Sequence, residues 1–353
     1  MPRVCWITSV LLAGWSASAA GVEPVFPGEH WARRDPITVG LDPTGLEAMS
    51  ELARGSGCVV RQGYLVYEWG EAGRRRDVAS AAKPVYTHFL IEAIAEGRVA
   101  GWDEPVDRWE PRLDGLNAGL GFKDRRITWR HLCNQVSCYG AGEAPGTAFD
   151  YNDHNMALLF DTLMLRVYRS TWERVDAEVL RPRLADRLQC EDDPTFMAFG
   201  PGNRPGRLAI SPRDFARFGL LYLREGRWGD RRLIPAALAR FVVANPLSLT
   251  IPRTQGKPAE MIPDQRSIGG GGNQCDHEGS YSYAWWINGL RRDGTRNWPD
   301  VPADAYGCFG HGDIRAVVVI PSLDLVVSWN DTKLEGHERV NAALKQLLPR
   351  PAK

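Results

Sequence analysis

The sequence has 353 residues, of which 44% are hydrophobic and 24% are charged, and its 43 basic side chains balance its 43 acidic ones. These values are typical of a soluble globular protein with one large domain or two, and they exclude a disordered or collagen-like chain. A net charge of zero offers no basic field for nucleic acid and no polybasic arm for an anionic membrane. We therefore expect a small-molecule or peptide substrate as partner, and the composition leaves the oligomeric state open.

The first 19 residues form a predicted signal peptide. Arg3 supplies a positive start, a short apolar run follows it, and Ala17-Ser18-Ala19 has the small residues of a cleavage site. An uncleaved membrane anchor is the alternative, but the run is shorter than the roughly 20 residues that cross a bilayer. The sequence therefore predicts a secreted or periplasmic protein without a membrane span, whose folded domain covers residues 20–353.

Six cysteines follow the predicted signal peptide: Cys58, Cys133, Cys138, Cys190, Cys275 and Cys308. An even set in an oxidising compartment can form disulfides, but the sequence does not choose a pairing and leaves buried free thiols equally open. Cys133 and Cys138 lie near His131, yet no further ligands follow at a zinc-binding spacing. We therefore predict no metal site and no cofactor.

A strand pair followed by a helix opens the folded part. Residues 58–61 and 64–69 are β-rich runs around Gln62-Gly63, which predicts a hairpin. After a polar, basic stretch the pattern becomes helical, with Val85, Phe89 and Ile94 among its apolar positions, and Gly97 marks the end of this helix.

The region from about residue 81 to 274 combines helical patterns with loops. Ser211-Pro212 is a helix cap followed by a first-turn proline, so residues 214–223 are predicted to be helical. Residues 245–274 contain several prolines and four consecutive glycines at 269–272, which predicts a long loop.

Strand patterns return near the C-terminus. Residues 281–287, 315–320 and 323–329 are predicted strands, and a final helix places Val340, Leu344 and Leu347 on one face. Strands at both chain ends with helices between them predict an α+β fold. Its sheet would come from residues 40–80 and 275–353 and would be flanked by helices, with a mostly helical region inserted at 81–274.

Ser80 and Lys83 stand at the start of the first long predicted helix. A spacing of three residues places both side chains on one helix face, so a lysine amine with a lowered pKa can take the serine proton. The helix N-terminus adds positive potential for the nucleophile and for a developing oxyanion. A helix cap followed by a solvent-exposed lysine is the other interpretation of this pattern.

A second polar motif, Tyr151-Asn152-Asp153, precedes an apolar helical run at 156–160. A phenol in such a loop can transfer protons if nearby positive charge lowers its pKa from about 10. A turn whose Asn and Asp cap the following helix explains the same residues. Metal binding by Asp150, Asp153 and His154 lacks further ligands at a recognisable spacing.

A third motif, Gly310-His311-Gly312-Asp313, precedes the predicted strand at 315–320. A small residue on each side of the histidine lets a substrate approach the backbone closely, and an imidazole can donate a proton or carry charge near neutral pH. A histidine packed on a strand end is the alternative.

In this chain order the three motifs resemble the serine β-lactamase and penicillin-binding-protein superfamily, in particular its class C-like branch, which includes esterases and D-amino-acid peptidases. That branch has SxxK, then YxN, then a KTG-like triplet often written HxG. Flanking segments are similar too, among them Pro145-Gly146-Thr147 and Ser211-Pro212-Arg213-Asp214. The resemblance covers about residues 40–350 and implies a β-lactamase/transpeptidase-like antiparallel sheet and a serine hydrolase.

The resemblance also implies a role for each matching residue. Ser80 would be the acylated nucleophile and Lys83 its activating amine. Tyr151 would act as general base and general acid, and His311 would position a substrate carbonyl or carboxylate. The backbone N–H groups of Ser80 and Ile314 would form the oxyanion hole.

Two residues depart from the family pattern. Asp153 stands where YxN has an amide, and Asp313 replaces the glycine of HxG, with Gly312 between His311 and Asp313 as a small residue facing the substrate. An Asp153 anion would raise the pKa of Lys83, and Asp313 would repel carboxylate substrates. The sequence therefore predicts hydrolysis of a neutral or cationic ester or amide by an esterase, peptidase or β-lactamase-like enzyme. The alternatives are a weak or inactive family member that binds a cell-envelope ligand, and chance agreement of motifs in an unrelated protein.

Overall fold

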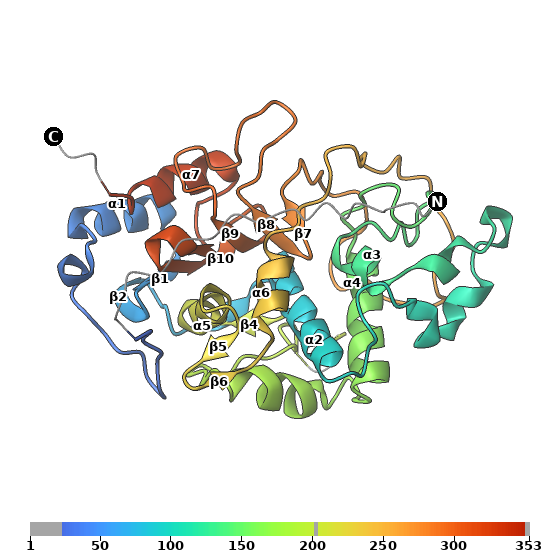
Figure 1. The fold of residues 1–353 in the computed structure, drawn as a ribbon, viewed down its shortest axis with the longest axis horizontal. Helices are drawn as coiled ribbons and strands as arrows, with labels where there is room; N and C mark the ends of the chain where they lie inside the picture. The colour runs from blue at the N-terminus through green and yellow to red at the C-terminus, as the bar shows by residue number, and fades with distance from the viewer. Residues whose placement is uncertain (1–22, 201–203, 350–353) are drawn as a thin grey trace, which may run out of the picture.

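A seven-stranded antiparallel sheet organises the computed structural model, which describes residues 23–200 and 204–349 (Figure 1). The predicted signal peptide lies outside the described residues. The strand order is β2-β1-β11-β10-β9-β8-β7. The strands are β1 (Ser56–Arg61), β2 (Tyr64–Trp69), β7 (Tyr281–Ser282), β8 (Trp285–Ile287), β9 (Tyr306–Gly310), β10 (Arg315–Ile320) and β11 (Leu325–Asn330).

Strands β1 and β11, which come from opposite ends of the described chain, lie side by side in this sheet. β1 pairs with β11 in a register that places Ser56 opposite Asn330 and Val59 opposite Val327. The predicted hairpin of β1 and β2 thereby extends the C-terminal strands. The predicted fold class, one antiparallel sheet from both chain ends flanked by helices, is confirmed.

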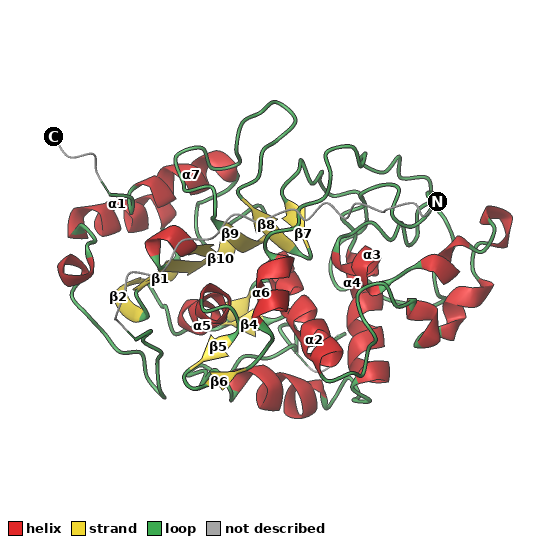
Figure 2. Cartoon of the chain, in the orientation of Figure 1, coloured by secondary structure: helices red, strands yellow, loops and turns green. Residues whose placement is uncertain are grey.

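Helices cover both faces of the sheet (Figures 1 and 2). Helices α1 (Pro43–Ala53) and α7 (His337–Lys345) lie together on one face, whereas α5 (Pro212–Leu223) packs against β1, β10 and β11 on the other. Gly219 of α5 permits this close packing, because a methyl group there would lie 2.7 Å from methyl carbons of Val317 and Val326.

The inserted region supplies the remaining elements beside α5. Its first long helix, α2 (Lys83–Ala95), contacts α5 through the ring of His88 against Phe218 and Tyr222. The other helices are α3 (Trp129–Cys133), α4 (Asp153–Asp161) and α6 (Ala236–Val242), with π-helical segments at Thr162–Val167 and Asp176–Ala185. Short ladders join β3 (Arg76–Asp77) to β4 (Ala209–Ile210) and β5 (Arg227–Trp228) to β6 (Arg231–Arg232). Short 3₁₀ helices occupy Pro36–Val39, Ala79–Ala82, Val106–Arg108, Pro111–Gly115, Ala118–Leu120, Lys123–Arg126 and Pro321–Leu323.

One strand prediction was wrong, and one strand was missed. The run at 281–287 is not one strand, because Tyr283 and Ala284 have φ values of 47° and 75° and turn the chain between β7 and β8. β9 was not predicted, since two of its five residues are glycines and its alternation is weak. Its identification matters because this strand lies beside Ser80.

The six cysteines after the predicted signal peptide are free thiols in the structure, four of them buried. Within the described ranges, no helix is both long enough and apolar enough to cross a membrane.

Candidate active site

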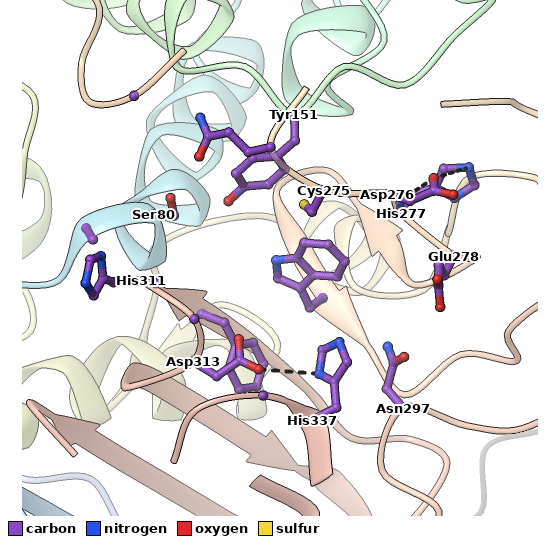
Figure 3. A pocket seen from close by; sticks show the side chains of 18 of the residues that line it. Ser80, Tyr151, Cys275, Asp276, His277, Glu278, Asn297, His311, Asp313 and His337 are labelled. Carbon is purple, nitrogen blue, oxygen red and sulfur yellow. Dashed lines mark hydrogen bonds and ion pairs between the residues drawn. The ribbon is translucent and has the colours of Figure 1, made fainter. Parts of the chain in front are cut away.

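A cleft of about 630 Å³ brings the three sequence motifs together (Figure 3). Its walls come from the 3₁₀ helix before α2, the start of α4, strand β8, the end of β9 and the turn after it, the start of α7 and the loop at 270–278. Ser80, Tyr151, Asp153, His311, Gly312 and Asp313 all line it.

Ser80 lies in the 3₁₀ helix Ala79–Ala82, immediately before α2. Lys83 is the first residue of α2, so the i, i+3 spacing places both side chains on one face, as predicted. The Lys83 ammonium donates a hydrogen bond of 2.7 Å to Ser80 Oγ. The Lys83 side chain is only 3% exposed, so bulk water does not screen this contact.

Tyr151 reaches the same serine from the loop before α4. Its ring packs against Tyr281 and Trp286, and Lys83 Nζ lies 4.5 Å from the ring centroid. Its hydroxyl points toward Ser80 in Figure 3, and Ser80 acts to lower the pKa of Tyr151. The phenol is therefore the second proton-transfer group beside the nucleophile.

At the start of α4, the side chain that contacts Lys83 is that of Asp153 and not that of Asn152. Asn152 caps α4 by accepting from the His154 amide at 2.8 Å, and its amide group donates to the Tyr139 carbonyl. Asp153 Oδ1 accepts from Lys83 Nζ at 2.7 Å. The carboxylate thus takes the position in which the family pattern has an amide.

A glycine-rich loop completes the surroundings of Asp153. Its Oδ2 accepts hydrogen bonds from the Gly270 amide at 2.6 Å and from Gln274 Nε2 at 3.2 Å. A methyl group on Gly269 would lie only 2.7 Å from this oxygen. The glycines at 269–272, predicted only as a loop, let the backbone approach the carboxylate.

Burial disfavours the charged forms of Lys83, Tyr151 and Asp153. The charges of these three residues also act on one another's pKa values. Burial lowers the pKa of Lys83, but the charges of Tyr151 and Asp153 outweigh it and raise this pKa above its ordinary value. Burial likewise works to raise the pKa of Asp153, yet Lys83 holds it below its usual range. Burial raises the pKa of Tyr151 despite the nearby Lys83 charge. At neutral pH the site therefore holds an ammonium, a carboxylate and a neutral phenol.

His311, Gly312 and Asp313 form the turn between β9 and β10. All three have positive φ, at 53°, 68° and 76°, which is unfavourable for the two residues that carry side chains. Trp329 Nε1 donates to the Asp313 carbonyl, and the Gly336 amide donates to the Gly312 carbonyl. The exposed His311 side chain lies next to Ser80 in Figure 3, at the mouth of the cleft.

Asp313 and His337 lie across the cleft from Tyr151 (Figure 3). The Asp313 carboxylate lies 3.5 Å from His337 Nδ1. Burial raises the pKa of Asp313 to about 6 and lowers that of His337. Asp276 and Glu278 also line the cleft, but each forms an ion pair with an arginine.

The expected second oxyanion donor, the N–H of Ile314, belongs to a residue outside the cleft lining. The Ile314 carbonyl accepts hydrogen bonds from Thr332. The backbone beside the nucleophile is instead Gly310, where a methyl group would lie 3.1 Å from the Ser80 nitrogen and 2.3 Å from the Val78 oxygen. The sequence pattern placed the motif at the entry to β10, whereas the strand end that adjoins Ser80 belongs to β9.

Comparisons with known proteins agree with this architecture. No protein-family model and no curated protein matches the sequence. The structure is similar to EstCE1, described as a hydrolase with promiscuous acyltransferase activity (TM-score 0.60, 13% identity, 86% of this chain and 98% of that one). It is also similar to a penicillin-binding-protein homologue from Caulobacter crescentus (0.56, 15%, 87% and 98%) and to a class C β-lactamase (0.54, 12%, 86% and 95%).

The chain has the β-lactamase and penicillin-binding-protein fold. Within this fold, sequence reasoning missed cleft residues that distant segments supply, including Arg207, Gln274, Cys275 and His337. The pair Trp285-Trp286 did carry a usable signal, because neighbouring strand residues face opposite ways. Trp286 lines the cleft and Trp285 stacks on Phe218 in the core.

Among the residues that the structure describes, no group of three or more His, Cys, Asp or Glu side chains is placed to hold a metal ion.

Proposed function

We propose that this protein is a secreted serine hydrolase that cleaves an ester or amide through an acyl-enzyme on Ser80. The observation that carries the proposal is the arrangement around the serine. Lys83 Nζ lies 2.7 Å from Ser80 Oγ, and the Tyr151 hydroxyl points toward the same side chain inside the cleft (Figure 3). A serine between a buried cation and a phenol has the partners that nucleophilic catalysis requires.

The charge state assigns the proton-transfer steps. Because Asp153 holds Lys83 as an ammonium, Lys83 cannot take the Ser80 proton. Tyr151 first gives its phenolic proton to solvent, and the resulting phenolate, which the ammonium stabilises, accepts the Ser80 proton. Ser80 Oγ then attacks the substrate carbonyl carbon, and the π electron pair moves to oxygen. The Ser80 N–H lies beside this oxyanion.

Breakdown of the tetrahedral intermediate completes the reaction. The carbonyl reforms, the bond to the leaving group breaks, and the Tyr151 hydroxyl protonates the departing alcohol or amine. Water then attacks the acyl-serine ester, giving its proton to Tyr151. Collapse of this second intermediate releases the carboxylic acid and returns the proton to Ser80.

The charges in the cleft favour neutral or cationic substrates. Asp276 and Glu278 are paired with arginines, whereas Asp313 has only His337 as an ion-pair partner within the described residues. An uncompensated carboxyl on the wall repels substrate carboxylates and attracts an ammonium group.

Turnover of a matched panel tests the proposal. Nitrophenyl esters and nitroanilides with neutral, cationic and anionic acyl groups are assayed with wild type, Ser80→Ala and the exposed-loop control Ser248→Ala. We expect a burst of leaving group equal to the enzyme concentration, lost in Ser80→Ala and kept in Ser248→Ala. Equal turnover by Ser80→Ala would reject the acyl-enzyme at Ser80.

One observation favours a second candidate function. The Lys83–Asp153 ion pair stabilises the protonated lysine, which disfavours its use as a base. A catalytically weak protein that binds a cell-envelope ligand in the same cleft would show this feature. Calorimetric binding of cell-wall fragments without turnover in wild type would favour this candidate, whereas a leaving-group burst would exclude it.

Secretion is supported by the N-terminal sequence pattern. We expect the full chain, expressed in a Gram-negative host, to reach the periplasm and to begin at Ala20 after cleavage. Intact mass of the periplasmic fraction measures this directly. Retention of residues 1–19 on protein found in the cytoplasm would contradict it.

A further inference from the structure

The residue before the nucleophile has a strained backbone. Ala79 has a φ of 49°, in the left-handed region that a residue with a Cβ rarely adopts. Such a conformation persists only where surrounding contacts impose it. Because Ala79 directly precedes Ser80, the contacts that impose its backbone conformation also set the direction of the nucleophile.

Asp77 supplies the side-chain contact that holds this turn. Its Oδ1 accepts a hydrogen bond of 3.0 Å from the Ala79 amide. The backbone of Asp77 is fixed in turn, because β3 pairs Asp77 with Ala209, and the next residue, Val78, donates to the Leu208 carbonyl at 2.9 Å.

Two arginines hold the Asp77 carboxylate. Arg207 binds both oxygens, with Nε 3.0 Å from Oδ1 and Nη2 in contact with Oδ2. Arg315 Nη1 donates to Oδ2 at 3.0 Å. A bidentate arginine contact with a second cation leaves the carboxylate little freedom to rotate away from the Ala79 amide.

The same arginines belong to the other two parts of the site. Arg207 lines the cleft beside the glycine loop, where a methyl group on Gly269 would lie 3.1 Å from Arg207 Nη1 and 2.7 Å from Asp153 Oδ2. Arg315 is the first residue of β10, directly after the turn of His311 to Asp313. Asp77 therefore connects the nucleophile turn to the loop around Asp153 and to the histidine turn.

We propose that Asp77 is a positioning residue, which holds Ser80 in its reactive geometry through Ala79, Arg207 and Arg315. Asp77 does not line the cleft, so it acts through these neighbours and not on the substrate. The inference rests on the proposed function of Ser80. Displacement of a reacting group by about 1 Å can cost about 100-fold in rate, which sets the size of the expected effect.

Two Asp77 variants and one matched control test the proposal by the rate at which a fluorophosphonate probe labels Ser80. Asp77→Ala removes the contact with Ala79 and both arginine pairs, and we expect about 100-fold slower labelling. Asp77→Asn keeps an oxygen for the Ala79 amide, so its loss is expected to be smaller, about tenfold.

Asp192→Asn is the control, because it breaks a similar pair away from the cleft. Asp192 binds Arg213 through both oxygens and is 11% exposed, against 15% for Asp77. At equal folded fraction, measured by thermal unfolding, we expect Asp192→Asn to be labelled at the wild-type rate. Unimpaired labelling of Asp77→Ala, or an equal loss in Asp192→Asn, would overturn the proposal.

A rescue experiment separates positioning from general stability. Glycine adopts a positive φ without the penalty of a Cβ, so Ala79→Gly should restore part of the labelling rate in the Asp77→Ala background. A purely structural role of Asp77 would not be repaired at this position. Failure of the double variant to recover any rate would contradict the role assigned to Ala79.

Hydrogen exchange keeps the test independent of catalysis. We expect faster amide exchange across residues 78–85 in Asp77→Ala than in wild type, and unchanged exchange there in Asp192→Asn. If wild type fails to react with the probe, the proposed function fails while this comparison still decides whether Asp77 holds the turn. Equal exchange in Asp77→Ala and wild type would overturn the proposal.

Discussion

The cleft contains two largely buried aspartates whose pKa values are shifted in opposite directions. Asp153 is 8% exposed and Asp313 is 16% exposed, so both carboxyls are largely removed from water. Asp153 accepts hydrogen bonds from Lys83, Gly270 and Gln274, and its pKa is lowered although burial opposes this. Burial raises the pKa of Asp313 to about 6. The difference shows that hydrogen-bonding and charged partners decide whether the pKa of a largely buried carboxyl falls or rises.

This contrast divides the cleft into two walls. On the wall with Ser80, Asp153 fixes the charge of Lys83 and leaves Tyr151 as the only group that changes its protonation during acylation. On the opposite wall, Asp313 is the group that titrates between acid and neutral pH.

The largest expected effect comes from removing the two proton-transfer partners of Ser80. Tyr151→Phe and Lys83→Met should each lower the labelling rate of Ser80 by about 10²- to 10⁴-fold, because each removes a group in contact with the nucleophile. The double variant should lose little more than the worse single variant, since the residues act as a unit.

Tyr139→Phe is the matched control for these variants. Tyr139 is also a buried, hydrogen-bonded phenol, but it does not line the cleft. Wild-type labelling in Tyr151→Phe, measured by intact mass against time, would remove Tyr151 from the mechanism.

Replacing the charged aspartate on the Ser80 wall should increase the rate. Asp153→Asn removes a negative charge that raises the pKa values of both Lys83 and Tyr151, so both pKa values should fall. We expect labelling at pH 7 to become about tenfold faster, the equivalent of about one pKa unit. A slower rate in folded Asp153→Asn would show that the carboxylate assists the reaction.

The pH dependence of the labelling rate in wild type follows from the protonation of Tyr151, on the wall with Ser80. Because the pKa of Tyr151 is raised above 10, its phenolate is scarce at neutral pH and increases about tenfold per pH unit. The labelling rate should therefore climb steadily from pH 6 to pH 9, and the profile of Asp153→Asn should be displaced toward lower pH. A rate that is constant over this range in wild type would be inconsistent with Tyr151 as the base.

The smallest effect is expected on the opposite wall and concerns stability. Because the pKa of Asp313 is raised from 3.8 to about 6, the folded protein binds more protons than the unfolded chain between these values. The free energy of unfolding should therefore fall as the pH rises through this window. The Asp313→Asn variant has no carboxyl to titrate at this position, so its free energy of unfolding should not show this fall. At pH 7 the variant should be more stable than wild type by about 1–3 kcal/mol.

Asparagine also tolerates the positive φ at this position. Denaturant unfolding at pH 4 and pH 7 measures the effect. If the free energy of unfolding of Asp313→Asn equals that of wild type at both pH values, the raised pKa does not belong to Asp313.

Local sequence patterns identified Lys83, which is close to Ser80 in the chain. They also identified Tyr151 and Asp153, which stand at the start of a capped helix. The i, i+3 spacing sufficed for Ser80 and Lys83, because it acts within one helical turn. The position of Tyr151 and Asp153 at the start of a capped helix was also visible in the sequence. Their convergence on one serine was implied only by the resemblance of the three motifs to a known superfamily.

Long-range placement could not be predicted from the sequence. The choice between Gly310 and Ile314 depends on which strand end adjoins Ser80, and the glycines of β9 concealed that strand. The positive φ values of Tyr283 and Ala284 are similarly invisible, because neither residue type favours a turn of this kind. His337 enters the cleft from α7, and no local pattern indicates that contact.

Intact mass after exposure to a fluorophosphonate serine probe tests the central claim, that Ser80 is an activated nucleophile. The expected result is a single adduct on wild type that is absent from Ser80→Ala. No adduct on wild type that is shown to be folded, or an adduct that persists in Ser80→Ala, would contradict this account.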